Sequence, residues 1–568
     1  EMSASLVGSE MCIRDSPLLE NRKGQKEHEY LYFEFQELNG RQAVRKGSWK
    51  LVHMNIRGDK PYYELYNLAA DPSEKHNVLS QYPEKVEELK NIMKEASLYN
   101  NYKGELGMNY QINNNQSVGI RYSLSASPKD KVWYKAESEI LANGDYYDHL
   151  LSSSNSVTVK KPSQQINAYY SATFGQLTID FNADALWSKV RTTNEIEETS
   201  HKQASRMIQS TNKVDNKLYA GKLLFSYPIA EGTFSFGSEY THTHRYDLFA
   251  NPQEILPTTD NHIKETHTGF FAEYNRFIKI AYLNIGLRYE HISSEHSYSN
   301  FFPNISLATQ IGKFQTQLSY TTKIKRPFYN QLSSNMRYMN RFTYMSGNPD
   351  LKPETIHDLT LSGSYKWLQF MISYQREKDA ILYITEQYKK NPAITTVTHR
   401  NFNRIDNFSA FLTASPAVGS WHPQLTVGVQ KQWAKIEHNG ETLQMDTPLF
   451  FCTLNNGIQL PYHWTLSTDI NFQSKGDYQN IYMYQNVFMM NATLTKSFLN
   501  EHLSIHLQGI DLTHGRKDGN RIYNKHMNMD VANVSDSREL RFTIRYKFNT
   551  AKSKYKGKGA ATEEIKRL

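Results

Sequence analysis

Long apolar runs are missing from this chain of 568 residues, and its mean hydropathy is −0.66. No stretch approaches the roughly 18 consecutive apolar residues that a membrane-spanning helix requires. This absence argues against a helical membrane protein. It does not argue against a membrane β-barrel, because a strand that faces lipid needs only every second residue to be apolar.

Cysteine is also scarce, since only Cys12 and Cys452 are present and they lie far apart in the chain. A disulfide framework is therefore not expected, and no cysteine spacing of a zinc site exists. The sequence also lacks a P-loop, a dinucleotide-binding glycine fingerprint, an HExxH motif and a nucleophile elbow. We accordingly predict no catalytic residue, no cofactor site and no metal site.

Excess charge of one sign is small, with a formal net charge of +8. Much of it lies in the C-terminal sequence KSKYKGK, residues 552–558. We expect residues 551–568 to be a solvated basic tail, and we expect no nucleic-acid partner.

Tyrosine, in contrast, is abundant, with 38 residues, and aromatic residues make up 13% of the chain. Amphipathic rings are favoured at both membrane–water interfaces, so this excess fits the aromatic girdles of a barrel. A soluble β-protein rich in tyrosine is the alternative.

The last predicted strand has one apolar and one polar face, because successive side chains of a strand point to opposite sides. Its polar face carries Arg541, Thr543, Arg545 and Lys547. We interpret it as the strand that closes a barrel, with an outward apolar face formed by Leu540, Phe542, Ile544, Tyr546 and Phe548.

The same alternation recurs back to about residue 101, for example in Val118, Ile120, Tyr122 and Leu124. It predicts an all-β fold over residues 99–550: a closed antiparallel transmembrane barrel of about 20–22 strands, some of them missing. The expected partner of its outer face is outer-membrane lipid.

Connections of two kinds separate the predicted strands. Tight turns are expected at Gly175-Gln176, Gly312-Lys313, Lys366-Trp367 and Asn500-Glu501. Long polar loops are expected over residues 128–164, 191–212, 245–262, 325–353, 437–447, 475–484 and 515–537. Short periplasmic turns and long extracellular loops are typical of bacterial outer-membrane barrels.

The N-terminal part differs in character. Residues 1–16 show neither a structural period nor the pattern of a secretory signal, so we expect a non-native or disordered segment. Residues 17–96 predict a small α+β unit with short strands and a helix over 83–96. That helix has Pro83 at its first position and an apolar stripe of Val86, Leu89 and Met93.

The run HEYLYFEF…RQAVRKGSWKLV…YELYNLAADPSEKHNV…YPEKVEELKNIMKEA resembles the C-terminal subdomain of arylsulfatase-type sulfatases. The resemblance implies a remnant without activity, because the formylglycine motif C/S-x-P-x-R and the calcium-binding domain of that family are not found. Cys12 lies in MCIRD and lacks the required proline. A structural role is expected for His28 and Lys46, with contact to a sulfated substrate as the alternative.

A second resemblance rests on a loop that begins at Arg326-Pro327 and continues to SGNPDLKPE at residues 346–354. It is similar to the corresponding passage of TonB-dependent receptors, especially the Bacteroidetes-type outer-membrane β-barrel family. Proline restricts its own φ and the residue before it, so the passage should enter its strand extended. The residues of the motif are Arg326, Pro327, Gly347, Asn348, Pro349, Leu351, Lys352, Pro353 and Glu354. Glu354 is expected to be solvated, with a salt bridge in the barrel mouth as the alternative.

This resemblance implies nutrient uptake across the outer membrane of a Gram-negative cell, driven by the inner-membrane TonB complex through an N-terminal plug. The plug and the TonB-contact segment are not found, so we expect no gated, energised uptake by this chain alone. Both termini should face the periplasm. The alternatives are a sulfatase-related protein and a passive or adhesive barrel. The abrupt change at residues 97–101 suggests a junction of two gene fragments.

Two side-chain groups could still bind ligands. His242 and His244 are expected on one face of a strand end, near His262 and His267, where imidazoles could hold zinc or copper. Histidines at a polar barrel rim are the more common alternative. The aromatic residues between Phe328 and Tyr344 are expected to anchor the interface, with stacking on a sugar as the alternative.

Overall fold

The computed structural model describes residues 2–5, 30–35, 41–55, 61–96, 102–142, 145–438, 440–523, 528–534, 537–547 and 555–568. Within these ranges no helix combines the length and the apolar composition needed to cross a membrane. The described residues form a small unit, which is a four-stranded sheet with one helix, and a large unit, which is a very large antiparallel sheet with a second four-stranded sheet built from the segments 476–483 and 517–534.

The small unit is an antiparallel sheet of β2 (Leu31–Phe35), β3 (Arg41–Lys46), β4 (Trp49–Met54) and β5 (Tyr62–Asn67). Helix α2 (Pro83–Ala96) covers one face of it. The predicted apolar stripe of the helix is buried against Val44, Leu51 and Leu65, so the α+β prediction for this segment agrees with the structure. Burial of these side chains is the main source of its stability.

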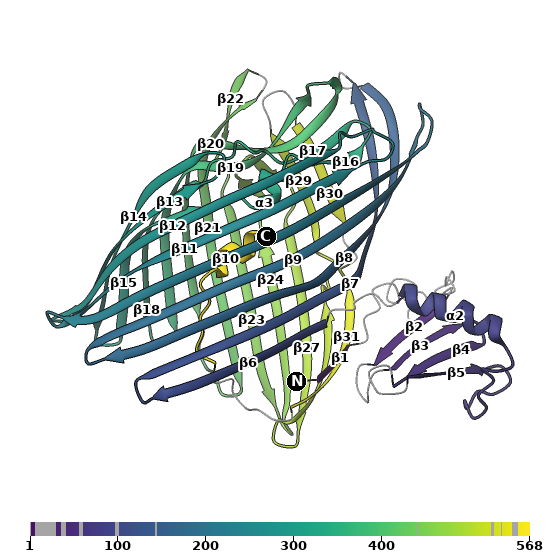
Figure 1. Ribbon diagram of the computed structural model, residues 1–568, viewed down its shortest axis with the longest axis horizontal. Coiled ribbons are helices and arrows are strands. Elements are labelled where there is room, and N and C mark those ends of the chain that lie inside the picture. Colours follow the sequence, from purple (N-terminus) through teal and green to yellow (C-terminus); the bar gives the residue numbers. More distant parts are fainter. Residues whose placement is uncertain are drawn as a thin grey trace.

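Most of the chain forms a single sheet in which neighbouring strands follow one another in sequence (Figure 1). Its long strands are β6 (Tyr102–Asn113), β7 (Gln116–Ala142), β8 (Asp145–Phe174), β9 (Leu177–Ser200), β10 (Arg206–Ile229), β11 (Gly232–Ala250), β12 (Thr259–Ile278), β13 (Ala281–Ser293), β14 (Ser297–Ile311), β15 (Phe314–Lys325), β18 (Glu354–Tyr365), β19 (Leu368–Tyr388), β20 (Asn391–Ala414), β21 (Trp421–His438), β23 (Leu449–Leu460), β24 (Trp464–Gln473), β27 (Val487–Phe498), β28 (Leu503–Ile510) and β31 (Glu539–Tyr546).

The strand register extends the two chemical faces across the sheet. Leu361 of β18 pairs with Leu318 of β15 and with Ile372 of β19, and all three side chains are exposed. Large exposed apolar side chains at such positions form the outer face. Polar and charged side chains, such as Asp358 and Ser373, point to the opposite, inner face, where they are buried. This distribution confirms the predicted alternation.

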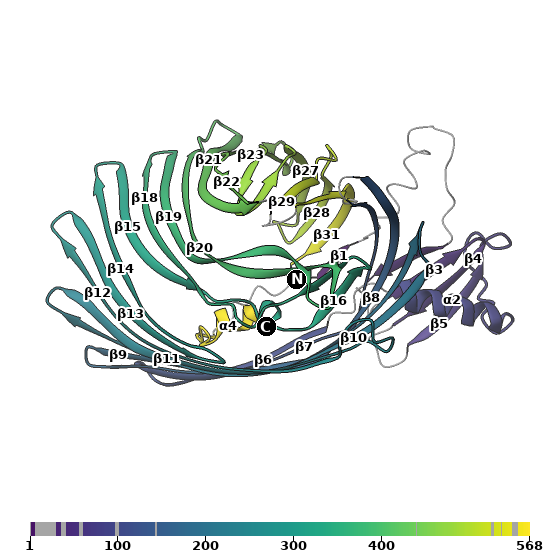
Figure 2. The same cartoon turned by 90° about the horizontal axis from the view of Figure 1, so that it is seen from above.

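The large antiparallel sheet of barrel type is confirmed, but it is curved without being closed, as Figure 2 shows from above. Among the described residues, β31 pairs with β28 and with β1 (Met2–Ser5), and no register joins β31 to β6. The prediction of closure, with β31 as the closing strand, is therefore wrong for this structure. Leu540, Phe542, Ile544 and Tyr546 do lie exposed on the outer face, whereas Phe548 is outside the described residues.

The 23-stranded sheet includes β1, β16 (Met336–Asn340), β17 (Thr343–Ser346) and β22 (Glu441–Met445). Met2–Ser5 belongs to the segment that we expected to be disordered or non-native, yet it forms a strand beside β31. The predicted tight turns are present, and they are marked by the closing pairs Phe174–Leu177, Ile311–Phe314, Tyr365–Leu368 and Phe498–Leu503.

Most of the predicted long loops contain strands. β7 and β8 continue through residues 128–164, and their register reaches Ala142–Asp145. The segment 475–484 contains β25 (Gly476–Tyr478) and β26 (Ile481–Met483), and 515–537 contains β29 (Lys517–Tyr523) and β30 (Asn528–Val534). In these segments polar side chains interrupt the alternation of apolar residues, so the sequence predicts loops. Strands still form there, because the backbone hydrogen bonds between strands do not depend on apolar side chains.

The C-terminal segment also differs from the prediction. Residues 555–568 lie on the concave side of the curved sheet and end in the short helix α4 (Thr562–Arg567) (Figure 2). Ala561 is 2% exposed, and Glu564 and Arg567 are buried, so this end is not a solvated tail.

Candidate functional site

Five charged side chains meet on the inner face, and we name them the inner-face cluster: Glu265, Glu290, Arg326, Glu564 and Arg567. Glu265 and Glu290 come from the neighbouring strands β12 and β13, and Arg326 follows β15. Glu564 and Arg567 come from α4. None of the five side chains is more than 12% exposed.

Arg567 is the most highly connected member. Its Nη1 lies 2.5 Å from Glu265 Oε1 and 2.6 Å from Glu564 Oε2, and its Nη2 lies 3.2 Å from Glu265 Oε2. Its Nε donates to the carbonyl oxygen of Pro327 at 3.0 Å, and its guanidinium lies 4.5 Å from the ring centre of Tyr329. A planar guanidinium offers fixed donors that match a carboxylate in this way.

Arg326 links Glu564 to the third acidic member, Glu290. It pairs with Glu564, and its Nη2 is 3.6 Å from Glu290 Oε2. Glu290 also pairs with Arg288 and lies 3.3 Å from His267 Nε2. Because buried charges are costly without partners, these ion pairs hold the end of β15, β13 and α4 in one arrangement.

The remaining motif residues fold into a tight loop beside this cluster. The backbone N–H of Asn348 donates to the carbonyl of Gln331 at 2.6 Å, and its amide Nδ2 donates to the carbonyl of His399 at 2.9 Å. Lys352 N–H donates to Asn401 Oδ1 at 2.8 Å. Leu351 is buried, and a cavity of about 50 Å³ is lined by Pro327, Pro349, Leu351, Pro353 and Arg567, among others.

Gly347 is required by close packing. A Cβ atom at this position would lie 2.3 Å from the carbonyl oxygen of Ser333 and 2.5 Å from that of Gln331. These carbonyls end the short helix α3 (Tyr329–Leu332). Only glycine allows the motif to approach α3 so closely.

Glu354 is not solvated, contrary to the expectation. It is fully buried, its Oε2 lies 3.2 Å from Lys325 Nζ, and it accepts a hydrogen bond from the backbone N–H of Ile381 at 3.3 Å. The alternative role, a salt bridge at the mouth of the sheet, is the one that the structure shows.

The histidines do not form one site. His242, His244 and His262 lie on the outer face, where the rings of His244 and His262 stack at 5.8 Å. His267 points inward to Glu290. In the part of the chain that the structure describes, no group of three or more His, Cys, Asp or Glu side chains is arranged for a metal ion.

The aromatic loop is also placed differently from the prediction. Tyr338 and Tyr344 are buried in a core cluster with Ile208, Phe249 and Leu256, rather than exposed at an interface. Tyr338 donates to Glu198 at 2.9 Å. Glu198 in turn receives hydrogen bonds from the backbone and side chain of Arg341, at 2.9 and 2.6 Å.

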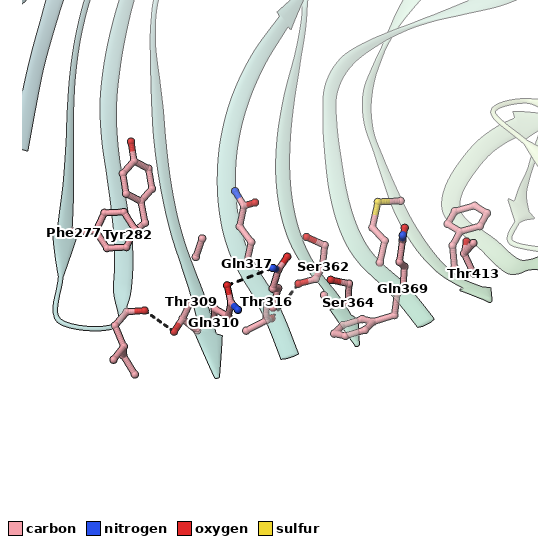
Figure 3. A pocket seen from close by; sticks show the side chains of 17 residues that line it. Phe277, Tyr282, Thr309, Gln310, Thr316, Gln317, Ser362, Ser364, Gln369 and Thr413 are labelled. Carbon is pink, nitrogen blue, oxygen red and sulfur yellow. Dashed lines mark hydrogen bonds between the residues drawn. The ribbon is translucent and has the colours of Figure 1, made fainter. Parts of the chain in front are cut away.

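A larger cavity of about 830 Å³ lies at the short-turn end of β12 to β20 (Figure 3). Its lining contains amide and hydroxyl side chains, including Gln310, Gln317, Ser362 and Thr413, together with Phe277 and Tyr282. None of its described lining residues is charged. The lining of the cavity is therefore uncharged, whereas the inner-face cluster consists of charged side chains.

Sequence reasoning found Arg326, Pro327 and the motif 347–354 but missed Glu265, Glu290, Glu564 and Arg567. The partners Glu265 and Arg567 are 302 positions apart. No local spacing signals such a pair. β12 and β13 each carry a few charged side chains on the inner face, such as Glu265, Arg288 and Glu290, and strands without such a cluster do so too.

In the N-terminal unit, Lys46 Nζ lies 3.1 Å from Glu88 Oε1 of α2, as expected for a structural residue. His28 lies outside the described residues. This part of the chain is similar to the N-acetylgalactosamine-6-O-sulfatase of Bacteroides thetaiotaomicron, with 38% identity over 74 residues. The match covers 11% of this chain and 14% of that sulfatase, so the chain spans only a small part of the relative's length.

Two solved structures resemble the large sheet. One is the siderophore receptor PirA from Pseudomonas aeruginosa, with 13% identity, a TM-score of 0.41, and coverage of 79% of this chain and 77% of that one. The other is the outer membrane transporter YddB from Escherichia coli, with 10% identity, a TM-score of 0.45, and coverage of 79% and 76%.

A family model described as the outer membrane protein beta-barrel family matches residues 173–546, well over half of the chain. These residues form the sheet from the end of β8 to β31, with its apolar outer face and its charged inner face. The chain therefore belongs to the outer membrane protein beta-barrel family.

Proposed function

We propose that this chain is the outer-membrane barrel of a receptor of the TonB-dependent type, which takes up a small nutrient across the outer membrane. The observation that carries the proposal is the position of the motif 347–354. It lies on the inner side of a sheet with an apolar outer face and shares a cavity with the inner-face cluster. A passive pore has no need for a buried loop of this kind on its inner face.

The solute that suits the inner face is small and polar. The cavity of about 830 Å³ has amide and hydroxyl groups that can exchange hydrogen bonds with hydroxyl groups of a ligand, and aromatic rings beside them. The inner-face cluster adds charged groups held in fixed positions. Glycans, peptides and metal chelates are the classes that the family resemblance implies. The receptor PirA is described as a siderophore receptor.

We further propose an orientation in which the tight turns at residues 175–176, 312–313 and 366–367 face the periplasm. The segments that contain β16, β17, β22, β25, β26, β29 and β30 then face the outside. In this arrangement β1 and the end of β31 at Tyr546 belong to the periplasmic side, whereas residues 555–568 lie along the inner face, where the carbonyl oxygen of Leu568 accepts a hydrogen bond from Arg245. In the intact family, a plug inside the barrel would receive energy from the TonB complex, and we propose no gated uptake by the present segment alone.

We propose no enzymatic activity for residues 17–96. The similar sulfatase of Bacteroides thetaiotaomicron has a far longer chain, and the sequence of this protein contains no C/S-x-P-x-R motif. A sulfatase-related protein that carries a barrel remains the first alternative. Hydrolysis of a sulfated N-acetylgalactosamine by the purified chain would favour it.

The experiment that tests the main proposal begins with expression of the full chain in a Gram-negative host. We expect it in the outer-membrane fraction and, after purification in detergent, we expect ion conductance in planar lipid bilayers in potassium chloride. Accumulation of a solute in liposomes that depends on the TonB complex would contradict the expectation that this segment alone lacks gated uptake. A chain that stays monodisperse in buffer without detergent would contradict the barrel itself.

A passive or adhesive barrel is the second candidate, since the outer face alone would serve it equally well. Substitution of the motif separates the two. In a receptor, Gly347→Ala should alter ligand-dependent changes in conductance, whereas in an adhesive barrel it should leave cell attachment and conductance unchanged.

A further inference from the structure

The C-terminal segment is the part of the inner face that the proposed function does not explain. We infer that the sheet residues of the inner-face cluster, Glu265, Glu290 and Arg326, form a peptide-binding site for an arginine-bearing segment, and that residues 555–568 of the same chain occupy it as a tethered ligand. When residues 555–568 are bound, the site is closed to other ligands. Release of the segment exposes Glu265 and Glu290 to the lumen.

The segment is held at its beginning by hydrogen bonds to β8 and β9. The hydroxyl of Tyr555 donates to the carbonyl oxygen of Asn167 at 3.0 Å, and the backbone N–H of Lys558 donates to Asn182 Oδ1 at 3.1 Å. The guanidinium of Arg121 lies 4.8 Å from the ring centre of Tyr555. These contacts fix the direction of the segment along the inner face.

A single carboxylate, that of Asp184, binds the middle of the segment. Asp184 Oδ2 accepts hydrogen bonds from the backbone N–H groups of Ala560 and Ala561, at 2.5 and 2.9 Å. Its Oδ1 is held by Asn167 Nδ2 at 2.7 Å, and Asp184 is 5% exposed. A buried carboxylate held by a neighbour and aimed at backbone N–H groups recognises the peptide itself and not a particular side chain.

An apolar floor lies beneath these residues. Leu186, Leu218 and Ala220 are buried against Ala561, with Ile565 and Leu568 packed beside them. Three apolar side chains on the inner face of a membrane barrel are otherwise unfavourable, because that face is in contact with water. The segment covers these side chains with Ala560, Ala561, Ile565 and Leu568 and thereby removes them from water.

Arg567 supplies the specificity. Its guanidinium forms ion pairs with Glu265 and Glu564 and donates a hydrogen bond to the carbonyl of Pro327. It also lies over the ring of Tyr329. A lysine ammonium could not satisfy these acceptors in one plane. Without Arg567, the carboxylate of Glu265 would remain buried with the hydroxyl of Tyr329 at 3.3 Å as its remaining hydrogen-bond donor among the described residues. Arg567 therefore supplies the cation that is hydrogen-bonded to Glu265.

Disulfide trapping in the full chain tests this inference. In a background with Cys12→Ser and Cys452→Ser, Leu218→Cys is combined with Ala561→Cys, since both side chains belong to the same buried cluster. The matched control combines Tyr219→Cys with Ala561→Cys, because Tyr219 is the next residue but lies on the outer face, 43% exposed. The protein is placed in liposomes and oxidised, and the disulfide is quantified by mass spectrometry.

We expect the Leu218 pair to form the disulfide and the Tyr219 pair to form none. Adding Arg567→Ala should slow disulfide formation at least about tenfold, because a buried carboxylate loses its partner. Adding Lys566→Ala should leave the rate unchanged, because Lys566 is exposed and its ion pair with Glu563 lies within α4. A synthetic peptide of residues 555–568 should slow the reaction in competition, and the same peptide with Arg567→Ala should not.

The retention of fold is checked independently, by the heat-dependent shift in gel mobility that folded barrels show. In protein folded by that criterion, absence of the Leu218 disulfide would overturn the inference, as would equal rates for both cysteine pairs. Equal competition by the two peptides would overturn the arginine specificity. None of these readouts measures transport, so they stand apart from the proposed function.

Discussion

Glu354 of β18 and Lys325 of β15 face each other across one ladder, with Glu354 Oε2 3.2 Å from Lys325 Nζ, but only the glutamate is buried. Its side chain is 1% exposed, whereas that of Lys325 is 51% exposed. The pair is thus asymmetric, and the two members cannot be removed at equal cost.

We predict that Lys325→Met destabilises the folded protein by about 2–3 kcal/mol, because it leaves a buried carboxylate without its cation. Glu354→Gln should cost less, since the remaining lysine is solvated. Lys323→Met, an exposed residue two positions away on β15, is the control and should have little effect. The measurement is the urea midpoint of unfolding in lipid vesicles. Equal losses for Lys325→Met and Glu354→Gln would contradict the asymmetry.

The two faces of β18 give a second prediction. Leu361→Arg places a charge on the apolar outer face and should cost about 2–4 kcal/mol of folding free energy in a bilayer. The neighbouring Ser362→Arg points to the inner face and should be tolerated. Assembly into vesicles, followed by the mobility shift on gels, measures both variants. Comparable loss in both variants would show that the outer face does not contact lipid.

Gly347 gives a third prediction. Gly347→Ala forces a Cβ atom against the carbonyls of Ser333 and Gln331, so α3 must move. We expect faster amide hydrogen exchange over residues 328–335, with the remainder of the sheet unaffected. Gly104→Ala is the control, because a Cβ atom there meets no atom within 4 Å. Unchanged exchange in the Gly347 variant would mean that the motif and α3 are not tightly packed.

A fourth prediction concerns pH and the small N-terminal unit. Hydrogen bonds from Lys85 and then Lys46 lower the pKa of Glu88 below its usual 4.5. A carboxyl group with a lowered pKa in the folded state stabilises that state above its unfolded pKa, and this contribution is lost as pH falls through the folded value. Amide protection of α2 should therefore decrease below about pH 4.5.

Glu88→Gln should remove most of that pH dependence. Glu87→Gln is the matched control, because Glu87 pairs with Lys90 inside the helix and does not join α2 to the sheet. Hydrogen exchange by mass spectrometry on the full chain measures both. If Glu88→Gln retains the whole pH dependence, another group must be its source.

The face that each residue of a strand presents could be predicted from the sequence. Side chains alternate on every strand, so Leu540, Phe542, Ile544 and Tyr546 were placed correctly on the outer face without knowledge of their neighbours. Turn residues also act locally, and the turns at Gly175 and Gly312 are present as predicted. The motif loop was found as a motif, but its burial was not predicted.

What the sequence could not reveal depends on contacts between distant residues. Polar segments such as 128–164 form strands because a neighbouring strand offers backbone partners, and polarity alone had suggested loops. The composition of the basic C-terminal segment predicts a solvated tail. In the structure the segment is buried instead, because the curved sheet brings Asp184, Leu218 and Glu265 together beneath it. Alternation is a property of one strand, and it followed from residue order. Whether a charged side chain forms an ion pair or is solvated depends on the groups that lie opposite it. The register and curvature of the whole sheet determine which groups those are.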